Sequence, residues 1–107
     1  MARRTPSARA ARRGRARAHA TLVRDLERLA RLAPGGSPER PIDVGSPAQI
    51  EPMALAKPCP LCEGSLALEH HAAETIDGVR LRVVAVRCVQ CGVRRRLYFR
   101  LAAPLTT

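Results

Sequence analysis

Aromatic residues are almost missing from this 107-residue sequence, which has one Tyr, one Phe and no Trp. Aromatic side chains contribute the largest apolar areas to protein cores. The hydrophobic fraction of 46% depends heavily on Ala, whose side chain buries little area. Any core made from these residues is small, and small domains usually need a metal ion or disulfides to remain folded.

Long apolar runs are missing as well. No stretch reaches the roughly 18 residues that a membrane-spanning helix requires. The basic N-terminal residues are not followed by a continuous apolar segment, so no secretory signal is indicated. An Arg- and Ala-rich beginning without acids also occurs in organellar transit peptides, and that alternative stays open. We expect a cytoplasmic protein that makes no contact with a membrane.

Acidic residues are scarce: nine Asp and Glu stand against 19 Lys and Arg, for a formal net charge of +10. Such an excess favours polyanionic partners, above all nucleic acid. Eighteen of the basic residues are Arg, a bias that a GC-rich genome would also produce. Codon bias does not explain the shortage of acids. Nucleic acid, a protein partner and simple solvation of charge therefore all remain explanations.

Residues 1–33 are predicted to form a basic, Arg-rich arm and an amphipathic helix. Apolar residues with helical spacing define one face of a helix over 18–33: Leu22, Leu26, Leu29 and Ala33. Thr5 and Pro6 form a typical N-cap and first-turn pair, so the helix can extend back toward them. Pro34 and the two glycines after it end the helix.

Residues 34–58 contain six of the nine prolines, interspersed with Gly and Ser, and show no hydrophobic period. This composition predicts a flexible, extended linker. At the other end of the chain, residues 102–107 are predicted to be a disordered tail.

Residues 59–101 are predicted to be the ordered module. Strand-like runs cover 65–76 and 79–87, and Asp77-Gly78 between them is a strong hairpin signal because both turn positions favour a positive φ. Pairing outward from this turn predicts one apolar face: Leu66, Leu68, Ala72, Ile76, Val79, Leu81, Val83 and Ala85. The opposite face is predicted to be mostly polar: Glu69, His71, Thr75, Arg80, Arg82, Val84 and Val86.

The four cysteines form two C-x-x-C pairs that are 25 residues apart. The hairpin brings the far ends of its strands together, so Cys62 and Cys88 are delivered to the same end. Two residues between the members of a pair let both sulfurs point inward, and zinc favours tetrahedral coordination by four thiolates. We predict one structural zinc ion with four ligands: Cys59, Cys62, Cys88 and Cys91.

The arrangement C-P-x-C-x-G followed by C-x-x-C-G, with Gly64 and Gly92 after the pairs, resembles members of the zinc-ribbon superfamily over residues 57–101. The resemblance implies a small, three-stranded antiparallel, non-catalytic fold. Many zinc ribbons serve transcription, translation or nucleic-acid metabolism, and others dock proteins. The expected architecture is a metal-stabilised, three-stranded antiparallel zinc ribbon, preceded by a basic amphipathic helix and a Pro-rich linker.

Other interpretations of the cysteines stay open. Two disulfides would suit a secreted scaffold, although no signal peptide supports secretion. A redox centre would use iron or a reactive C-x-x-C, but rubredoxins that hold iron have an aromatic-rich core, and thioredoxin-like motifs lie in a βαβ context. His70 and His71 are not required as ligands, and a packing or surface role is expected for each.

A third strand, predicted at 93–101, separates apolar from basic residues. One face carries Val93, Leu97, Phe99 and Leu101, and Arg95 is the exception. The other face carries Arg94, Arg96, Tyr98 and Arg100. Three guanidinium groups and one ring suit phosphate contacts and a single stacking platform. Arg80 and Arg82 are predicted to extend this surface, and a strand face kept soluble by charge is the alternative.

A second candidate surface for nucleic acid is the N-terminal arginine cluster, since flexible basic arms add affinity without reading sequence. Its members are Arg3, Arg4, Arg9, Arg12, Arg13, Arg15 and Arg17. With so few aromatic residues, base stacking contributes little, and the predicted binding is salt-sensitive and weakly sequence-selective.

Catalysis is not expected. No carboxylate pair, nucleophile–base pair or phosphate-binding loop is visible, and four thiolates leave zinc no open position for a substrate. We therefore expect no small-molecule substrate. The rival to nucleic-acid binding is a docking adaptor that offers the helix face of 22–33 to a protein partner or a second copy. A simpler alternative is that this helix covers the apolar face of the ribbon itself.

Overall fold

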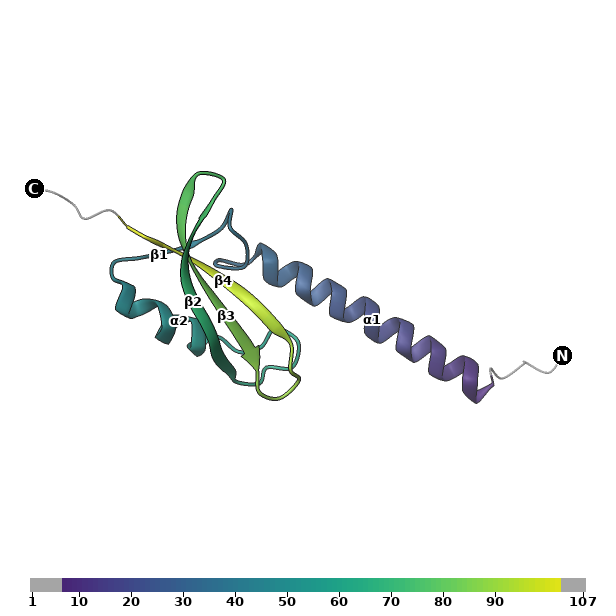
Figure 1. The fold of residues 1–107 in the computed structure, drawn as a ribbon. Coiled ribbons are helices and arrows are strands. Elements are labelled where there is room, and N and C mark those ends of the chain that lie inside the picture. The colour runs from purple at the N-terminus through teal and green to yellow at the C-terminus, as the bar shows by residue number, and fades with distance from the viewer. Residues whose placement is uncertain (1–6, 103–107) are drawn as a thin grey trace, which may run out of the picture.

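The computed structural model describes residues 7–102, which form a four-stranded mixed sheet, one long helix and one short helix (Figure 1). The elements are α1 (Ala8–Leu32), β1 (Ile42–Val44), a 3-10 turn (Pro47–Gln49), α2 (Ile50–Ala56), β2 (Leu66–Ile76), β3 (Val79–Cys88) and β4 (Arg94–Leu101). The strand order is β1-β4-β3-β2, with β1 parallel to β4 and the other neighbours antiparallel. The three predicted strands are present, but the sheet has a fourth.

The β2–β3 hairpin turns where the sequence predicts it. Asp77 has a φ of 50° and Gly78 a φ of 79°, and Ile76 pairs with Val79. Asp tolerates the left-handed region better than most residues, and Gly enters it without a steric penalty. The turn thus fixes the register of the hairpin near its tip.

A β-bulge at Glu69 changes which residues share a face, and it corrects the predicted two-faced hairpin. The register shifts between Leu68 and His70, so that Leu66 pairs with Cys88 and Leu68 with Val86. A bulge inserts one extra residue into a strand and so moves all residues beyond it to the opposite face. Leu66 and Leu68 therefore lie on the same face as Val86. The sequence predicts that this face is mostly polar.

The main core lies on that face of the sheet. It consists of Val44, Ile50, Ala54, Cys59, Leu66, Val84, Val86, Cys88, Leu97 and Phe99. His71 also faces this side, where its Nδ1 lies 3.3 Å from Glu51 Oε1 of α2. On the opposite face, Val83 is 2% exposed. Glu74 of β2 and Arg96 of β4 pair with the β3 residues on either side of Val83 on this face. Their ion pair therefore crosses β3 over Val83.

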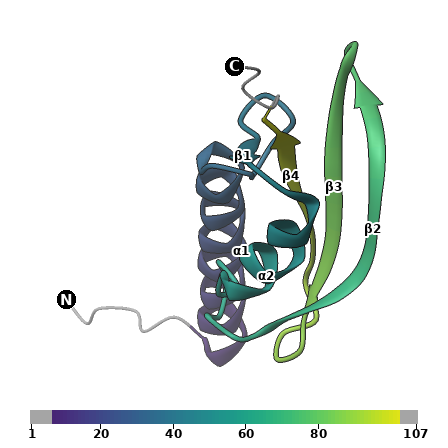
Figure 2. The same cartoon turned by 90° about the vertical axis from the view of Figure 1, so that its left-hand side faces the viewer.

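The structure corrects the prediction of an extended linker at 34–58, because that segment contains β1, the 3-10 turn and α2. Ile50 and Ala54 of α2 are fully buried in the core, and α2 lies beside the sheet (Figure 2). The Ser46 side chain accepts from the N–H of Ala48 and caps the turn. Pro47 and Pro52 lie at starts of helical turns, where no N–H partner is needed. The prolines that indicate a linker are therefore compatible with helical structure here.

Helix α1 does not cover the sheet. It begins at the cap residue Ser7, whose side chain accepts from the N–H of Ala10, whereas the predicted cap pair at residues 5 and 6 lies outside the described residues. None of its residues is buried, and Figure 1 shows it running away from the sheet. This corrects the alternative in which the helix packs on the ribbon, since α2 occupies that place.

The C-terminal end of α1 is held by the loop that follows it. Gly35, with a φ of 80°, accepts a hydrogen bond from Tyr98 N–H at 2.9 Å. The Arg40 guanidinium donates to the carbonyl of Leu32 at 3.1 Å and satisfies one of the last helical acceptors. Within residues 7–102, no helix has both the length and the apolar character needed to cross a bilayer.

Candidate metal centre and basic surfaces

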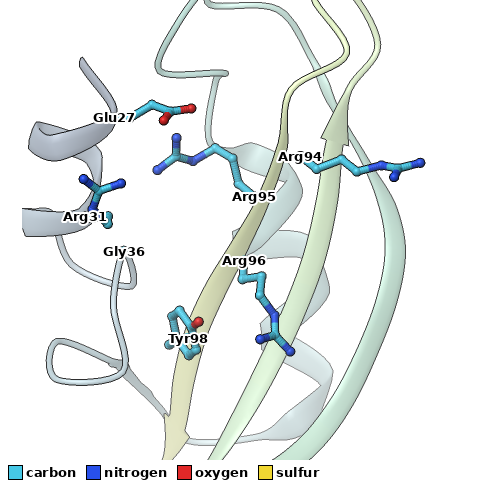
Figure 3. Close-up of a pocket in the computed structure, with 7 residues that line it drawn as sticks. All are labelled: Glu27, Arg31, Gly36, Arg94, Arg95, Arg96 and Tyr98. Atoms are coloured by element: carbon cyan, nitrogen blue, oxygen red, sulfur yellow. The ribbon is translucent and has the colours of Figure 1, made fainter. Parts of the chain in front are cut away.

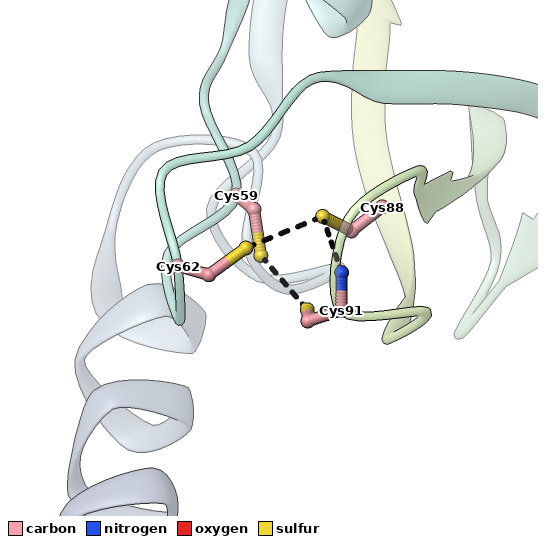
Figure 4. A group of neighbouring side chains, drawn as sticks. All are labelled: Cys59, Cys62, Cys88 and Cys91. Carbon is pink, nitrogen blue, oxygen red and sulfur yellow. Dashed lines mark hydrogen bonds between the residues drawn. The ribbon is translucent and has the colours of Figure 1, made fainter.

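The four cysteines meet at one end of the sheet (Figure 4). Their sulfurs all lie within 4.8 Å of one another, as predicted from the hairpin. Cys59 Sγ is 3.7 Å from Cys91 Sγ, and Cys62 Sγ is 3.4 Å from Cys88 Sγ. The thiols are free, since a disulfide would bring two sulfurs to about 2.05 Å. This cluster could hold a metal ion.

The two cysteine turns have the same backbone design. In each, the N–H four residues after the first cysteine donates to the carbonyl of that cysteine: Glu63 to Cys59 at 2.8 Å, and Gly92 to Cys88 at 3.0 Å. Glu63 and Gly92 have φ values of 64° and 79° respectively. Each turn therefore curls back through a left-handed residue and directs two sulfurs toward the other turn.

Backbone N–H groups point at the sulfurs and favour the thiolate form. The N–H of Cys91 and that of Gln90 each donate to Cys88 Sγ at 3.4 Å and lower the pKa of this thiol to about 6. At Cys62 the N–H of Gly64 acts in the same direction, but burial and the neighbouring thiols outweigh it and raise the pKa to about 12. Thiolates this close repel one another, and a bound cation removes that repulsion.

Gly64 is the closest backbone neighbour of the sulfurs among the glycines. A Cβ at this position would lie 3.0 Å from Cys88 Sγ, 3.2 Å from Cys62 Sγ and 2.8 Å from the Cβ of Gln90. The sequence pattern places this glycine one position late for the turn, and Glu63 takes the left-handed conformation instead. A glycine is thus needed at position 64 because a side chain there would collide with the sulfurs. At position 92 a glycine is favoured because the backbone has a positive φ.

The cluster fits a tetrahedral metal ion. Four sulfurs about 2.3 Å from a common centre would be about 3.8 Å apart; two of the six separations here are 3.4 and 3.7 Å, and all six are within 4.8 Å. Cys59 and Cys88 are fully buried, while Cys91 is exposed at the rim. Four thiols with backbone donors can bind a soft or borderline metal cation, and all four positions of a tetrahedron would be filled.

The predicted basic face of β4 exists, but its arginines are paired with carboxylates. Arg94 Nε lies 3.3 Å from Glu69 Oε1, and Arg96 Nη2 lies 2.9 Å from Glu74 Oε2. Arg100 Nε donates to Asp43 Oδ1 at 2.7 Å. Tyr98 shares this face with them. Exposed ion pairs are weak, yet each carboxylate reduces the positive potential that a phosphate would meet.

Arg80 and Arg82 do not extend that face, which corrects the sequence prediction. Arg82 pairs with Phe99 of β4, so it lies on the core side of the sheet, opposite Tyr98. Arg80, two residues earlier on β3, shares the side of Arg82. The predicted alternation of apolar and basic residues along β4 is confirmed. The register between β3 and β4 cannot be predicted from the sequence of either strand alone.

The arginines of α1 have a different environment. Eight of them lie in Ala8–Leu32, together with two acids, Asp25 and Glu27. All eight are exposed, Arg12 and Arg13 among them, and none is in an ion pair within residues 7–102. The first two members of the predicted cluster, residues 3 and 4, lie outside the described residues.

Arg31 of α1 and Arg95 of β4 belong to neither predicted basic surface. Arg95 is the exception in the alternation of β4, and Arg31 is in the last turn of α1. Both line one groove with Glu27, Gly36 and Tyr98. No local pattern indicates this arrangement, because it depends on how the loop after α1 docks on β4.

No protein-family model matches this chain, and neither does any curated protein or solved structure. The protein is a small domain with a four-stranded mixed sheet, and its four cysteines, Cys59, Cys62, Cys88 and Cys91, form a cluster able to hold a metal ion.

Proposed function

We propose that this protein is a non-catalytic zinc-binding module that binds nucleic acid through backbone phosphates. Zinc is the ion that best suits four thiolates in a tetrahedron. With four protein ligands the ion would have no open position for substrate or water, so its role would be structural. Small domains of this kind gain much of their folding free energy from the metal.

The observation that carries the nucleic-acid proposal is the exposure of the arginines of α1. They form no ion pair within the described residues, whereas the β4 arginines Arg94, Arg96 and Arg100 each face a carboxylate. Guanidinium groups that are not paired with a carboxylate of the described residues can release counterions from phosphates on binding, which is the main source of non-specific affinity. We therefore assign the principal contact surface to α1 and a smaller part to β4.

Anisotropy titrations with fluorescent DNA and RNA across a range of salt concentrations test this proposal. Contact with about six phosphates predicts a loss of at least three decades in affinity between low and near-physiological salt. Arg13→Gln/Arg17→Gln should weaken binding and lower the salt slope. The matched control Arg80→Gln/Arg82→Gln removes the same charge from the hairpin and should change binding less. A flat salt response, or a larger effect of the control pair, would contradict the proposal.

A second candidate function is protein docking through the apolar side of α1. It is favoured by the exposure of three large side chains, since Leu22, Leu29 and Leu32 are 55%, 63% and 52% exposed. Exposed apolar stripes on helices commonly meet a partner groove. A purified complex that survives nuclease treatment and is lost in Leu22→Ser/Leu29→Ser would support docking. A complex that nuclease abolishes would support nucleic-acid binding instead.

A further inference from the structure

A groove separates the end of α1 from the edge of β4, and its lining is strongly basic (Figure 3). Its volume is about 250 Å³, and it is lined by Glu27, Arg31, Gly36, Arg94, Arg95, Arg96 and Tyr98. Pockets that enclose whole small ligands usually measure about 300–1,000 Å³. This groove is smaller, and its size suits one charged group and its immediate neighbour on a chain.

Two guanidinium groups in this groove have no ionic partner among the described residues. Figure 3 shows Arg95 extending from β4 toward α1 and Arg31 extending from the facing helix. Neither is in an ion pair within residues 7–102, although Glu27 lies in the same groove. A phosphate in a groove that both guanidinium groups line can accept hydrogen bonds from each of them.

The groove continues the arginine face of α1. Five arginines follow one another at spacings of four, seven, four and three residues, which keeps them on one helix face: Arg13, Arg17, Arg24, Arg28 and Arg31. The last of them lines the groove. A polyanion that follows this face is thereby led to Arg95.

The edge of β4 supplies a backbone donor as well. Strand β1 pairs with β4 only from Phe99 onward, so the part before it is an open edge. Tyr98 N–H points outward, to the carbonyl of Gly35. Because N–H groups alternate along a strand, the N–H of Arg96 points to the same outward side. Backbone N–H groups frequently contact phosphates in nucleic-acid complexes.

Tyr98 lies at one end of the groove, half-buried and next to the loop residue Gly36 (Figure 3). Its backbone N–H donates to the carbonyl of Gly35, which holds this part of β4 against the loop after α1. An aromatic ring beside a phosphate site is a platform on which an unpaired base can stack. A duplex does not offer such a base, so the combination favours a single strand.

We infer that this groove binds one backbone phosphate of a single-stranded nucleic acid, held by Arg31, Arg95 and the N–H of Arg96, with the adjoining base stacked on Tyr98. This inference rests on the nucleic-acid binding proposed above and adds to it a defined site and a preference for single strands. Among the described residues, Glu27 is the one acid that lines the groove, and its charge opposes the phosphate.

The test is an anisotropy titration of the full, metal-loaded chain with a fluorescent 12-nucleotide oligothymidylate and with a duplex of the same length. Arg95→Gln should weaken single-strand binding severalfold and reduce the salt slope by about 0.7, the value of one phosphate contact. Glu27→Gln should strengthen binding. Tyr98→Leu should weaken it about fivefold or more, whereas Tyr98→Phe, which keeps the ring, should retain it. Circular dichroism and metal content establish that each variant is folded.

The outcomes separate this inference from the broader proposal. If Arg95→Gln, Glu27→Gln and Tyr98→Leu all bind as the unaltered chain does, while Arg13→Gln/Arg17→Gln weakens binding, the groove is not the site and nucleic-acid binding through α1 stands. Equal affinity for the duplex, together with a silent Tyr98→Leu, also overturns the groove as a single-strand site. If the unaltered chain binds neither oligonucleotide, both proposals fail.

Discussion

Arg100 of β4 and Asp43 of β1 lie opposite each other in the parallel strand pair and form a two-point ion pair, with Arg100 Nε and Nη2 donating to the carboxylate at 2.7 and 3.1 Å. Asp43 lies 57 residues earlier in the sequence. The contact joins the Pro-rich segment to the C-terminal strand, and the N–H of Ala102 adds a hydrogen bond to the carbonyl of Val44 at 2.8 Å. Residues 42–44 are thus part of the sheet.

The carboxyl group of Asp43 should titrate below the usual Asp range. The hydrogen bond from Arg100, and then its charge, lower the pKa of Asp43. A lowered pKa contributes stability above the ordinary value of about 3.9, and that contribution is lost as the pH falls through the lowered value. Carbon NMR titration should show the shift, and Arg100→Leu should abolish it. If the Asp43 pKa stayed low in Arg100→Leu, or rose as much in the control Arg94→Leu, Arg100 would not be the cause of the shift.

Ile50 should be among the most stabilising side chains outside the metal cluster. It is fully buried in the core through α2, so Ile50→Ala should cost about 2–5 kcal/mol in the free energy of unfolding. Leu55 on the same helix is 38% exposed, and Leu55→Ala should cost under about 1 kcal/mol. Urea denaturation of both metal-loaded variants measures the difference. Equal, small effects would mean that α2 does not cover the sheet.

Gly64→Ala should weaken metal binding. The added Cβ would press on the Sγ atoms of Cys62 and Cys88, both within 3.2 Å. Changes to groups that support metal ligands typically cost about 10- to 100-fold in affinity. Competition with a chromogenic chelator measures this loss. The matched control is Gly45→Ala, whose Cβ would meet nothing closer than 3.8 Å. A Gly64→Ala affinity equal to that of the control would argue against the close approach.

Glu63→Gly should stabilise the protein, since a non-Gly residue in the left-handed region costs about 1–2 kcal/mol, and the greater flexibility of Gly in the unfolded chain returns part of it. Glu63 has a φ of 64°. A net gain of up to about 1 kcal/mol is expected in urea unfolding of the metal-loaded protein. Gly92→Ala should show the opposite sign, because Gly92 has a φ of 79° and no atom within 4 Å of its missing Cβ. The same sign for both changes would contradict this account of the two turns.

Local patterns predict part of this fold well. The Asp77-Gly78 turn, the three strands around it and the meeting of the four cysteines all follow from short-range signals. The bulge at Glu69 has no such signal. It moves both Leu66 and Leu68 to the face of the sheet opposite the one predicted. Here the pairing is decided by burial of Leu66 with Val84 and Val86 in the core, rather than by alternation within one strand.

The missed elements depend on long-range contacts. β1 and α2 are short and lie in a segment whose prolines and small residues resemble a linker, yet Val44, Ile50 and Ala54 are buried in the core. A segment of this kind becomes ordered because an apolar sheet face is available to it, which sequence periodicity does not report. The basic surfaces show the same limit, since the carboxylates that face the β4 arginines come from β1 and β2.

The most direct measurement is the metal content of protein purified under reducing conditions, combined with its folding state before and after chelation. One zinc ion per chain is predicted, with loss of the cooperative unfolding transition when the metal is removed or when Cys91 is replaced in Cys91→Ser. A chain that contains no metal and still unfolds cooperatively would contradict the role assigned to the four cysteines.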